Sequence, residues 1–280
     1  MSTQQSIPAG GPIGIFDSGV GGLSIWREVT RALPDESVLY LADQAHVPYG
    51  PRSQGEIRDF CLEIAFYLRA SGCKAIVVAC NTASAVALKA IREEWPDMPI
   101  IGLEPAVKPA VALTRTGVVG VMATPATFQG RLYLATVGRH ARGVRVINQV
   151  CPGLASLVEE GALHGEVADA LLGDYLQPML SAGADVIVLG CTHYPFVIDA
   201  IRRLAGPGVA VVDPAPAVAR HLGQILRARG LLGGRGPAVH GFQTTGNPGV
   251  FDRQVLRLLG INVHSMGLAW TEEGALAAGV

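Results

Sequence analysis

The sequence predicts two pseudo-symmetric, three-layer α/β domains with mostly parallel sheets and an active site in the cleft between them. Short apolar segments alternate with amphipathic ones, which is typical of parallel sheets covered by helices. The pattern at residues 13–18 recurs at residues 119–124, and the pattern at residues 77–82 recurs at residues 188–193. Offsets of about 106 and 111 residues are too long for a solenoid and fit a duplicated domain.

The first half begins with an apolar strand at residues 13–16. A glycine-containing turn at residues 17–22 opens a helix that continues to about residue 33. Glycines in such a turn let the backbone approach a ligand closely. A second strand is predicted at residues 38–42, and a loop over residues 43–52 follows it.

A helix and a strand then lead to a cysteine. Ser53 and Glu56 have the spacing of a capping box, so a helix should begin there. The next elements follow in order: a strand at residues 75–79, a helix at residues 83–95 and a strand at residues 100–103. Cys80 therefore lies between the end of a strand and the start of a helix.

The second half repeats this order from residue 118. Residues 144–148 match the second strand, and a loop at residues 151–161 matches the loop that carries Tyr49. The segment from residue 213 is too short for a third α/β domain, so it should pack on the first half. Its predicted elements are a helix at residues 217–229, a strand at residues 239–243 and a helix at residues 250–259.

These boundaries predict a discontinuous first domain. We expect it to comprise residues 1–103 and 213–280, and the second domain to comprise residues 104–212. The chain of 280 residues is long enough for two ordinary domains, and its hydrophobic content of 49% is ample for buried cores.

The composition indicates the cellular compartment of the protein and the class of molecule that it binds. The formal charge of -1, without runs of like charge, gives no electrostatic reason to expect nucleic acid or a membrane surface, so a small molecule is the expected partner. Residues 1–11 lack the features of a secretory signal, and no apolar segment is long enough to span a bilayer. Five cysteines, an odd number, argue against a disulfide framework. We therefore expect a cytoplasmic protein.

Two cysteines occupy matching positions in the two halves. Cys80 and Cys191 each follow an apolar segment and precede a predicted helix start. A cysteine at a strand end is often only a small core residue. Helix amides stabilise a thiolate, however, so a pKa below the ordinary value of about 8.5 is expected for such a thiol.

Two opposed thiols suit a reaction in which one removes a proton and the other delivers one to the opposite face, as in a racemase or epimerase. Polar residues follow both thiols: Asn81, Thr82, Thr192 and His193. His193 is open to several interpretations, as a core or capping residue or as a group that donates a hydrogen bond, takes a proton or orients a substrate.

The turn at residues 17–22 is also open to two interpretations. It lacks the lysine ending of a P-loop and a full dinucleotide-binding pattern, so nucleotide binding is weakly supported. Ser18, the backbone amides and the helix end could equally hold a carboxylate. Thr124 and Thr127 mirror this turn in the second half.

Tyr49 and Gly50 lie in the loop after the second strand. Pro48 precedes them and would order a surface turn, which is one interpretation of the loop. The other is that the two residues close over the ligand.

Metal and pyridoxal phosphate are less well supported. Cys80, Cys191 and His193 could supply three zinc ligands, but no CxxC or HExxH spacing accompanies them. Pyridoxal phosphate needs a Schiff-base lysine, and none of the three lysines (Lys74, Lys89 and Lys108) lies in a strand-end loop. We expect neither a metal nor a cofactor.

With these residues in view, the chain resembles the glutamate racemases of the cofactor-independent aspartate/glutamate racemase superfamily. The resemblance is carried by residues 14–22, 47–50, 79–84 and 189–195, and residues 244–248 resemble the C-terminal strand and turn of that family. It covers nearly the whole chain, and as a set these motifs are highly specific.

The resemblance implies interconversion of L- and D-glutamate, which supplies D-glutamate for bacterial peptidoglycan. It implies that Cys80 and Cys191 are the acid/base thiols, one for each enantiomer, with Asp17 and His193 as auxiliary polar groups. The residues implied to hold the substrate are Asp17, Ser18, Tyr49, Gly50, Asn81, Thr82, Thr127, Thr192 and His193. Thr124 would lie behind them, and Glu159 near the entrance.

Two rival functions remain. One is a related racemase for aspartate or hydantoins, and the other is a non-catalytic amino-acid binder built from two α/β lobes, against which the paired thiols argue. The loop at residues 151–157 carries smaller residues than the family pattern, which leaves entry to the pocket and regulation open. No sequence feature fixes the oligomeric state, and a homodimer is left open.

Overall fold

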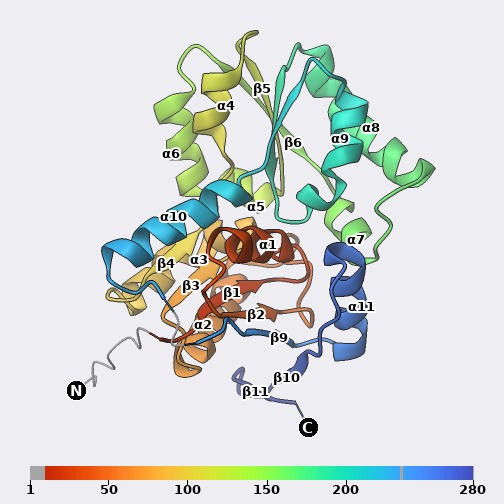
Figure 1. Ribbon diagram of the computed structural model, residues 1–280. Coiled ribbons are helices and arrows are strands. Elements are labelled where there is room, and N and C mark those ends of the chain that lie inside the picture. The colour runs from red at the N-terminus through yellow and green to blue at the C-terminus, as the bar shows by residue number, and fades with distance from the viewer. Residues whose placement is uncertain (1–9, 234–235, 280) are drawn as a thin grey trace.

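The computed structural model describes residues 10–233 and 236–279. Residues 1–9, on which the prediction of no secretory signal largely rests, lie outside the described residues. Within the described chain the strands form two separate sheets, which lie in the lower and upper parts of Figure 1. We call the parts built on these sheets the first lobe and the second lobe.

The first lobe contains a seven-stranded sheet in the order β11-β10-β9-β2-β1-β3-β4. Neighbouring strands pair in parallel, apart from the antiparallel pair β10 and β11. The strands are β1 (Ile13–Asp17), β2 (Val38–Ala42), β3 (Ala75–Val78), β4 (Ile100–Gly102), β9 (His240–Thr244), β10 (Met266–Trp270) and β11 (Leu276–Ala278). The predicted strands are confirmed within two residues, while β10 and β11 were not predicted.

The second lobe contains a four-stranded parallel sheet in the order β6-β5-β7-β8. Its strands are β5 (Val118–Ala123), β6 (Arg145–Val150), β7 (Val186–Gly190) and β8 (Ala210–Val212). This order repeats the order β2-β1-β3-β4 of the first sheet, so the predicted pseudo-symmetric α/β fold is confirmed. In both sheets the strand that leads to a site cysteine lies beside the first strand of its lobe.

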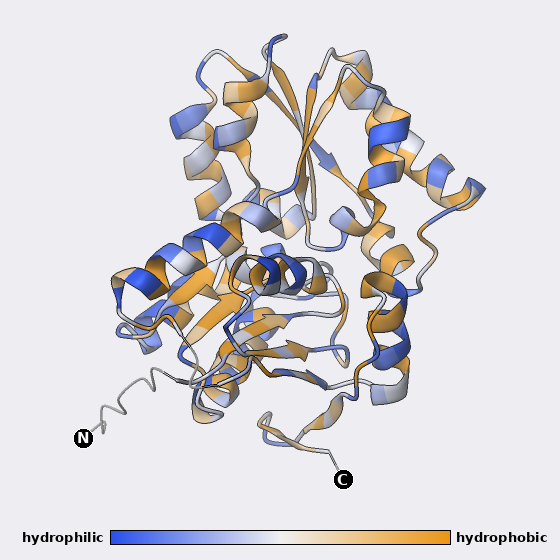
Figure 2. Cartoon of the chain, viewed as in Figure 1, coloured by the Kyte–Doolittle hydropathy of each residue, from blue (hydrophilic) through white to orange (hydrophobic). Residues whose placement is uncertain are grey.

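Helices cover the faces of the two sheets (Figure 1). Those of the first lobe are α1 (Leu23–Ala32), α2 (Gln54–Ala70), α3 (Asn81–Glu94), α10 (Ala215–Ala228) and α11 (Pro248–Leu259). Those of the second are α4 (Val107–Leu113), α5 (Pro125–Gln129), α6 (Arg131–His140), α7 (Leu154–Glu159), α8 (Glu166–Ser181), the 3-10 turn η1 (Tyr194–Val197) and α9 (Ile198–Ala205). Figure 2 shows mostly hydrophobic strands between helices that carry both hydrophobic and hydrophilic residues.

Local signals in the sequence account for the start of α2. Ser53 Oγ accepts a hydrogen bond from the Glu56 amide at 3.2 Å, and Glu56 Oε2 accepts one from the Ser53 amide at 3.0 Å. The predicted capping box is therefore confirmed. The predicted loop at residues 151–161 is wrong, because it contains α7, whose residues Leu154, Leu157 and Val158 are buried. The segment is too short to show a clear helical pattern in the sequence, but burial of these side chains stabilises the helix.

A buried ion pair lies at the end of β3 opposite to Cys80. Lys74, which is fully buried, forms an ion pair with Glu36, which is 2% exposed. The other carboxylate oxygen of Glu36 accepts a hydrogen bond from the Gly233 amide at 2.7 Å. The pair thereby ties the start of β3 to the segment before β2 and to the segment after α10.

Replacing only one partner of this pair should destabilise the protein strongly. We expect Lys74→Met to lower the free energy of unfolding by about 3–5 kcal/mol, because it leaves the Glu36 carboxylate buried without its counter-charge. Urea denaturation measures the change. The matched control is Lys89→Met, which breaks an exposed pair with Glu93 and should cost about 0.5 kcal/mol or less. Equal effects of the two substitutions would contradict the assignment.

Candidate active site

The two predicted cysteines lie at the carboxyl ends of equivalent strands, Cys80 after β3 and Cys191 after β7. Cys80 is 7% exposed and Cys191 is 8% exposed. They are close enough for a charge on Cys191 to raise the pKa of Cys80. The structure therefore brings the two thiols to one buried place between the lobes.

Cys80 is the residue that caps α3. The Ala83 amide donates a hydrogen bond to its sulfur at 3.4 Å, and Ser18 Oγ lies 3.9 Å from the same atom. The helix begins at Asn81, two residues earlier than predicted, because the Cys80 side chain can accept this capping bond. The thiol therefore has one polar neighbour in the turn after β1 and one in the first turn of α3.

The expected low pKa of Cys80 is wrong. Burial raises the pKa to about 12, and the charge of Asp17 acts in the same direction. The hydrogen bonds from Ala83 and Ser18 lower the pKa, but less than burial raises it. Cys80 is therefore a protonated thiol at neutral pH.

Cys191 has a different environment, so the expected symmetry of the two thiols is incomplete. No α-helix starts directly after it, since the 3-10 turn η1 begins at Tyr194 and α9 only at Ile198. Its sulfur lies 3.6 Å from Nδ1 of His193. A basic side chain therefore stands beside Cys191 where helix amides stand beside Cys80.

His193 links Cys191 to Glu159. Its Nε2 lies 2.7 Å from Glu159 Oε1, and the Val20 amide donates to that oxygen at 2.8 Å. Burial lowers the pKa of His193, but hydrogen bonds with Cys191 and Glu159 outweigh it and hold the pKa well above the ordinary value. The imidazole is therefore protonated, and the pKa of Glu159 lies below its ordinary value because its hydrogen bonds outweigh its burial.

Glu159 was expected near the entrance, and the structure places its carboxylate deeper. Its side chain is 12% exposed and is turned toward His193. Gln44 Nε2 also approaches Glu159 Oε2 at 3.4 Å, and Gln254 Nε2 donates to the Glu159 carbonyl at 2.7 Å. The end of α7 is therefore held against the first lobe.

Asp17 joins the two lobes beside Cys80. It is fully buried at the end of β1, and its Oδ2 accepts a hydrogen bond from Thr192 Oγ1 at 2.9 Å. Ser24 Oγ donates to the Thr192 carbonyl at 2.9 Å. Burial raises the pKa of Asp17, while the nearby His193 lowers it. Asp17 and Thr192 thus connect the surroundings of the two thiols.

The glycines of the turn after β1 allow this close approach. A Cβ atom on Gly21 would lie 2.4 Å from His193 Nδ1 and 2.6 Å from Thr192 Oγ1. One on Gly19 would lie 1.9 Å from Glu159 Oε1. These two glycines therefore make room for side chains of the other lobe, and a bound phosphate is not needed to explain them.

The predicted threonines form a chain of hydroxyl groups across the cleft. Thr82 Oγ1 lies 2.9 Å from Thr124 Oγ1, which lies 3.0 Å from Thr127 Oγ1. Asn81, directly after Cys80, is buried, and both its amide atoms lack a hydrogen-bond partner within the described chain. Burying an amide in this state is costly unless a ligand completes its hydrogen bonds.

The loop that carries Tyr49 lies on the first-lobe side of a cavity of about 330 Å³, which Pro48, Gly50 and Pro51 line from this loop. Gly50 lines this cavity together with Thr124, Cys151 and Tyr194. Tyr49 is 1% exposed, and its hydroxyl donates to Asp43 Oδ2 at 2.7 Å. The hydroxyl hydrogen of Tyr49 is thus used inside the protein, and a surface turn is excluded for its side chain.

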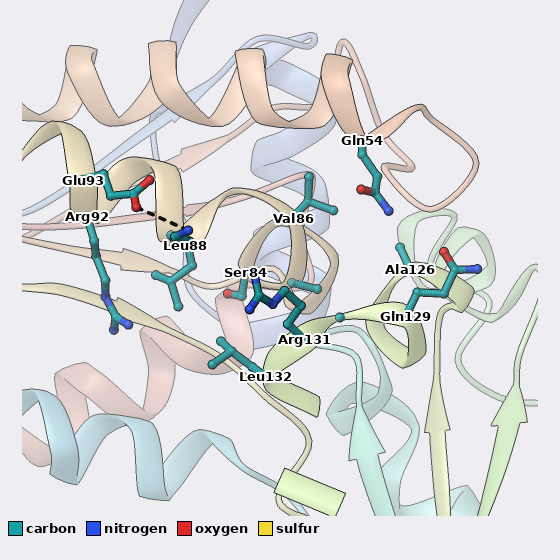
Figure 3. Close-up of a pocket in the computed structure, with 13 residues that line it drawn as sticks. Gln54, Ser84, Val86, Leu88, Arg92, Glu93, Ala126, Gln129, Arg131 and Leu132 are labelled. Carbon is teal, nitrogen blue, oxygen red and sulfur yellow. Dashed lines mark ion pairs between the residues drawn. The ribbon is translucent and has the colours of Figure 1, made fainter. Parts of the chain in front are cut away.

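A second cavity of about 520 Å³ lies away from the thiols, between α3 and the α5–α6 segment (Figure 3). Two of the positively charged side chains that line it already have partners within the protein. Lys89 pairs with Glu93 at 3.5 Å, and Arg92 Nη2 donates to the Ile100 carbonyl at 2.8 Å. Sequence patterns did not indicate this cavity.

In residues 10–233 and 236–279, histidine, cysteine and acidic side chains form no group of three or more that could hold a metal ion. In the same part of the chain, no helix has both the length and the apolar character needed to cross a membrane.

Comparisons with known proteins agree with one another. A family model described as Asp/Glu/Hydantoin racemase matches residues 13–222. A glutamate racemase of Roseiflexus sp. (strain RS-1) is 53% identical over 221 residues, which cover 79% of this chain and 81% of that protein. A glutamate racemase isoform of Bacillus anthracis has a TM-score of 0.84 at 34% identity, covering 92% of this chain and 97% of its own. A glutamate racemase of Francisella tularensis subsp. tularensis, crystallised with D-glutamate, has a TM-score of 0.81 at 31% identity with the same coverages.

The raised pKa of Cys80 should be visible in its reactivity. We expect its alkylation by iodoacetamide, followed by mass spectrometry of the Cys80 peptide, to keep rising from pH 8 to pH 10, because only the thiolate reacts. In the urea-unfolded chain the same reaction should level off above about pH 9. Burial slows the access of iodoacetamide to Cys80 equally at each pH, so the rise of the alkylation rate with pH reports the pKa of the thiol. A plateau at or below pH 8.5 in the folded protein would contradict the assignment.

Proposed function

The chain belongs to the Asp/Glu/Hydantoin racemase family, and we propose that it interconverts L- and D-glutamate by passing the α-proton between two thiols. The observation that carries this proposal is the meeting of Cys80 and Cys191 at the ends of equivalent strands, both nearly buried. Relatives named as glutamate racemases support glutamate as the substrate. The product D-glutamate would supply bacterial peptidoglycan.

The proposed reaction is balanced without a redox step. One sulfur, as thiolate, takes the proton from the α-carbon, and the electron pair of the broken C–H bond stays on that carbon. The opposite thiol gives its proton to the other face, so one S–H bond forms and another breaks. Each direction of turnover then begins with the opposite thiol as the base, which is why two thiols are needed.

His193 and Glu159 give Cys191 its role in this proposal. The imidazole lies 3.6 Å from the sulfur of Cys191, the thiol that acts as the base in one direction of the reaction, and Glu159 holds the imidazole in place. Cys80, whose raised pKa keeps the thiol protonated, is the matching proton donor. Asp17 is the auxiliary group beside Cys80, through its charge and its bond to Thr192.

Glutamate carries two carboxylates and one ammonium, so its site needs both donors and acceptors. The Asn81 amide, which has no hydrogen-bond partner among residues 10–233 and 236–279, offers one donor group and one acceptor. The hydroxyls that complete the proposed substrate site are those of Ser18, Thr82, Thr127 and Thr192, with Thr124 joining Thr82 to Thr127. Gly50 lines the cavity, and Tyr49, the residue before it, belongs to the same loop. Fixed donors in a site that excludes water stabilise the developing carbanion more strongly than water does.

No cofactor is needed for this chemistry. Lys74 is engaged by Glu36 at the far end of β3, while Lys89 and Lys108 are exposed on α3 and α4. None of the three therefore stands where a Schiff base would reach the thiols. The five cysteines are free in the structure.

Further proposals concern the setting of the enzyme. We propose a cytoplasmic location, with glutamate as partner and neither nucleic acid nor a membrane; a homodimer is compatible with this. We also propose the division into residues 1–103 with 213–280 and residues 104–212, which the pairing of β9 with β2 supports.

A circular-dichroism assay of D-glutamate conversion, without added cofactor and with chelator present, tests the function. Cys80→Ser and Cys191→Ser should each lower kcat by about 10²–10⁴-fold, because a serine hydroxyl is a far weaker acid than a thiol. Cys73→Ser, which changes a core thiol of the first lobe, serves as control and should retain kcat. In deuterated water the wild-type protein should incorporate deuterium at the α-carbon.

Near wild-type racemisation by either site variant would overturn the two-thiol scheme. Equal turnover of D-aspartate would favour the aspartate racemase, and binding of glutamate without α-proton exchange would favour the amino-acid binder.

Gly21→Ala tests the close approach of the two lobes. The added methyl group must displace the His193 ring, so we expect kcat to fall by about 10–100-fold. Gly138→Ala in α6 is the matched control, because a Cβ there meets no atom within 4 Å; it should leave kcat unchanged and raise the melting temperature slightly. Unchanged kcat in Gly21→Ala would show that the contact does not position His193.

A further inference from the structure

Asp43, the residue directly after β2, is a fully buried carboxylate with four hydrogen-bonding partners. They are Tyr49 Oη at 2.7 Å, His46 Nδ1 at 2.9 Å, Thr245 Oγ1 at 2.8 Å and Trp270 Nε1 at 2.8 Å. A buried carboxylate is tolerated when its oxygens are satisfied in this way. The number of partners shows that Asp43 joins several segments rather than capping one.

These partners come from three parts of the chain. His46 and Tyr49 belong to the loop after β2, Thr245 follows β9, and Trp270 ends β10. The pairing of Ala42 with Thr244 brings Thr245 next to Asp43, and the Ala45 amide also donates to Thr245 Oγ1 at 2.9 Å. Asp43 therefore connects the C-terminal strands to the loop that carries Tyr49 and Gly50.

Aromatic rings close around this carboxylate. His46 stacks on Phe60 with ring centroids 3.8 Å apart, and Trp270 contacts both rings at 5.0 Å and 5.5 Å. Because these rings exclude water, the hydrogen bonds to Asp43 act in a low-dielectric environment and are stronger than surface bonds. Trp270 thus fixes Asp43 through both its indole N–H and its packing.

The same carboxylate reaches the active site through Tyr49. Tyr49 gives its hydroxyl hydrogen to Asp43, and it packs in the hydrophobic cluster that contains Cys80. Gly50, the next residue, lines the cavity beside Thr124 and Tyr194. The Asp43 amide donates to the Asp17 carbonyl at 2.9 Å, so the loop also starts next to the Asp17 strand end.

We propose that Asp43 is a positioning residue for the substrate loop, and that Trp270 and Thr245 of the C-terminal segment hold it in place. This inference rests on the proposed racemase function. The chain of contacts from Trp270 through Asp43 to Tyr49 fixes the position of the neighbouring Gly50 at the cavity. It acts on substrate binding and leaves the proton transfer between the thiols unchanged.

The test compares variants that each remove one donor to Asp43. Trp270→Phe and Thr245→Val should each raise KM for both glutamate enantiomers by about three- to tenfold, with kcat within about twofold of wild type. Thr245→Ser keeps the hydroxyl and should restore the wild-type KM. Tyr49→Phe combined with Trp270→Phe should raise KM by less than the product of the single effects, because both act through one carboxylate in series.

Trp26→Phe is the matched control. It also removes a buried indole N–H, but this N–H has no hydrogen-bond partner within the described chain, so KM should stay unchanged even where the melting temperature falls. The proposal is overturned if Trp270→Phe and Thr245→Val lower the melting temperature without raising KM, or if the double variant shows the full product. A wild-type protein without racemase activity would instead overturn the proposed function.

Discussion

The turn after β1 and the segment after β7 approach so closely that side chains of one lobe occupy the space over glycines of the other. Asp17 accepts a hydrogen bond from Thr192, the Val20 amide holds Glu159, and Glu159 holds His193. The first two of these bonds cross between the lobes, and the third joins two segments of the second lobe. The site therefore exists only when the lobes are in contact, because neither lobe alone contains both thiols or the groups that surround them.

The two thiols show how a duplicated fold can support unequal chemistry. Cys80 accepts a hydrogen bond from a helix amide but is buried near the carboxylate of Asp17, so its pKa is raised. Cys191 lacks a following α-helix and has instead the protonated His193 beside it. The strand order of the first lobe recurs in the second, whereas the charged side chains around the two thiols differ.

Much of this arrangement could be predicted from the sequence, because it follows from local patterns and their repetition. Matching apolar segments before Cys80 and Cys191 identified equivalent strands, and Ser53 with Glu56 identified the start of α2. The sign of the pKa shift of Cys80 could not be predicted, because burial depends on how the lobes pack. The depth of Glu159 depends in the same way on α7, a helix too short to leave a clear periodicity. Asp43 carries no signal at all, since two of its partners lie about 200 residues away or more.

The order of strands along the chain has a consequence for synthesis. All four strands of the second sheet precede β9, so on the ribosome that sheet can be completed while the first sheet still lacks β9, β10 and β11. Until β9 emerges, β2 is an open edge whose unpaired backbone groups can recruit a foreign strand. Closing this edge also brings Thr245 and Trp270 to Asp43. The strands synthesised after the second sheet therefore cover the open edge of β2 and bring the partners of Asp43 into place.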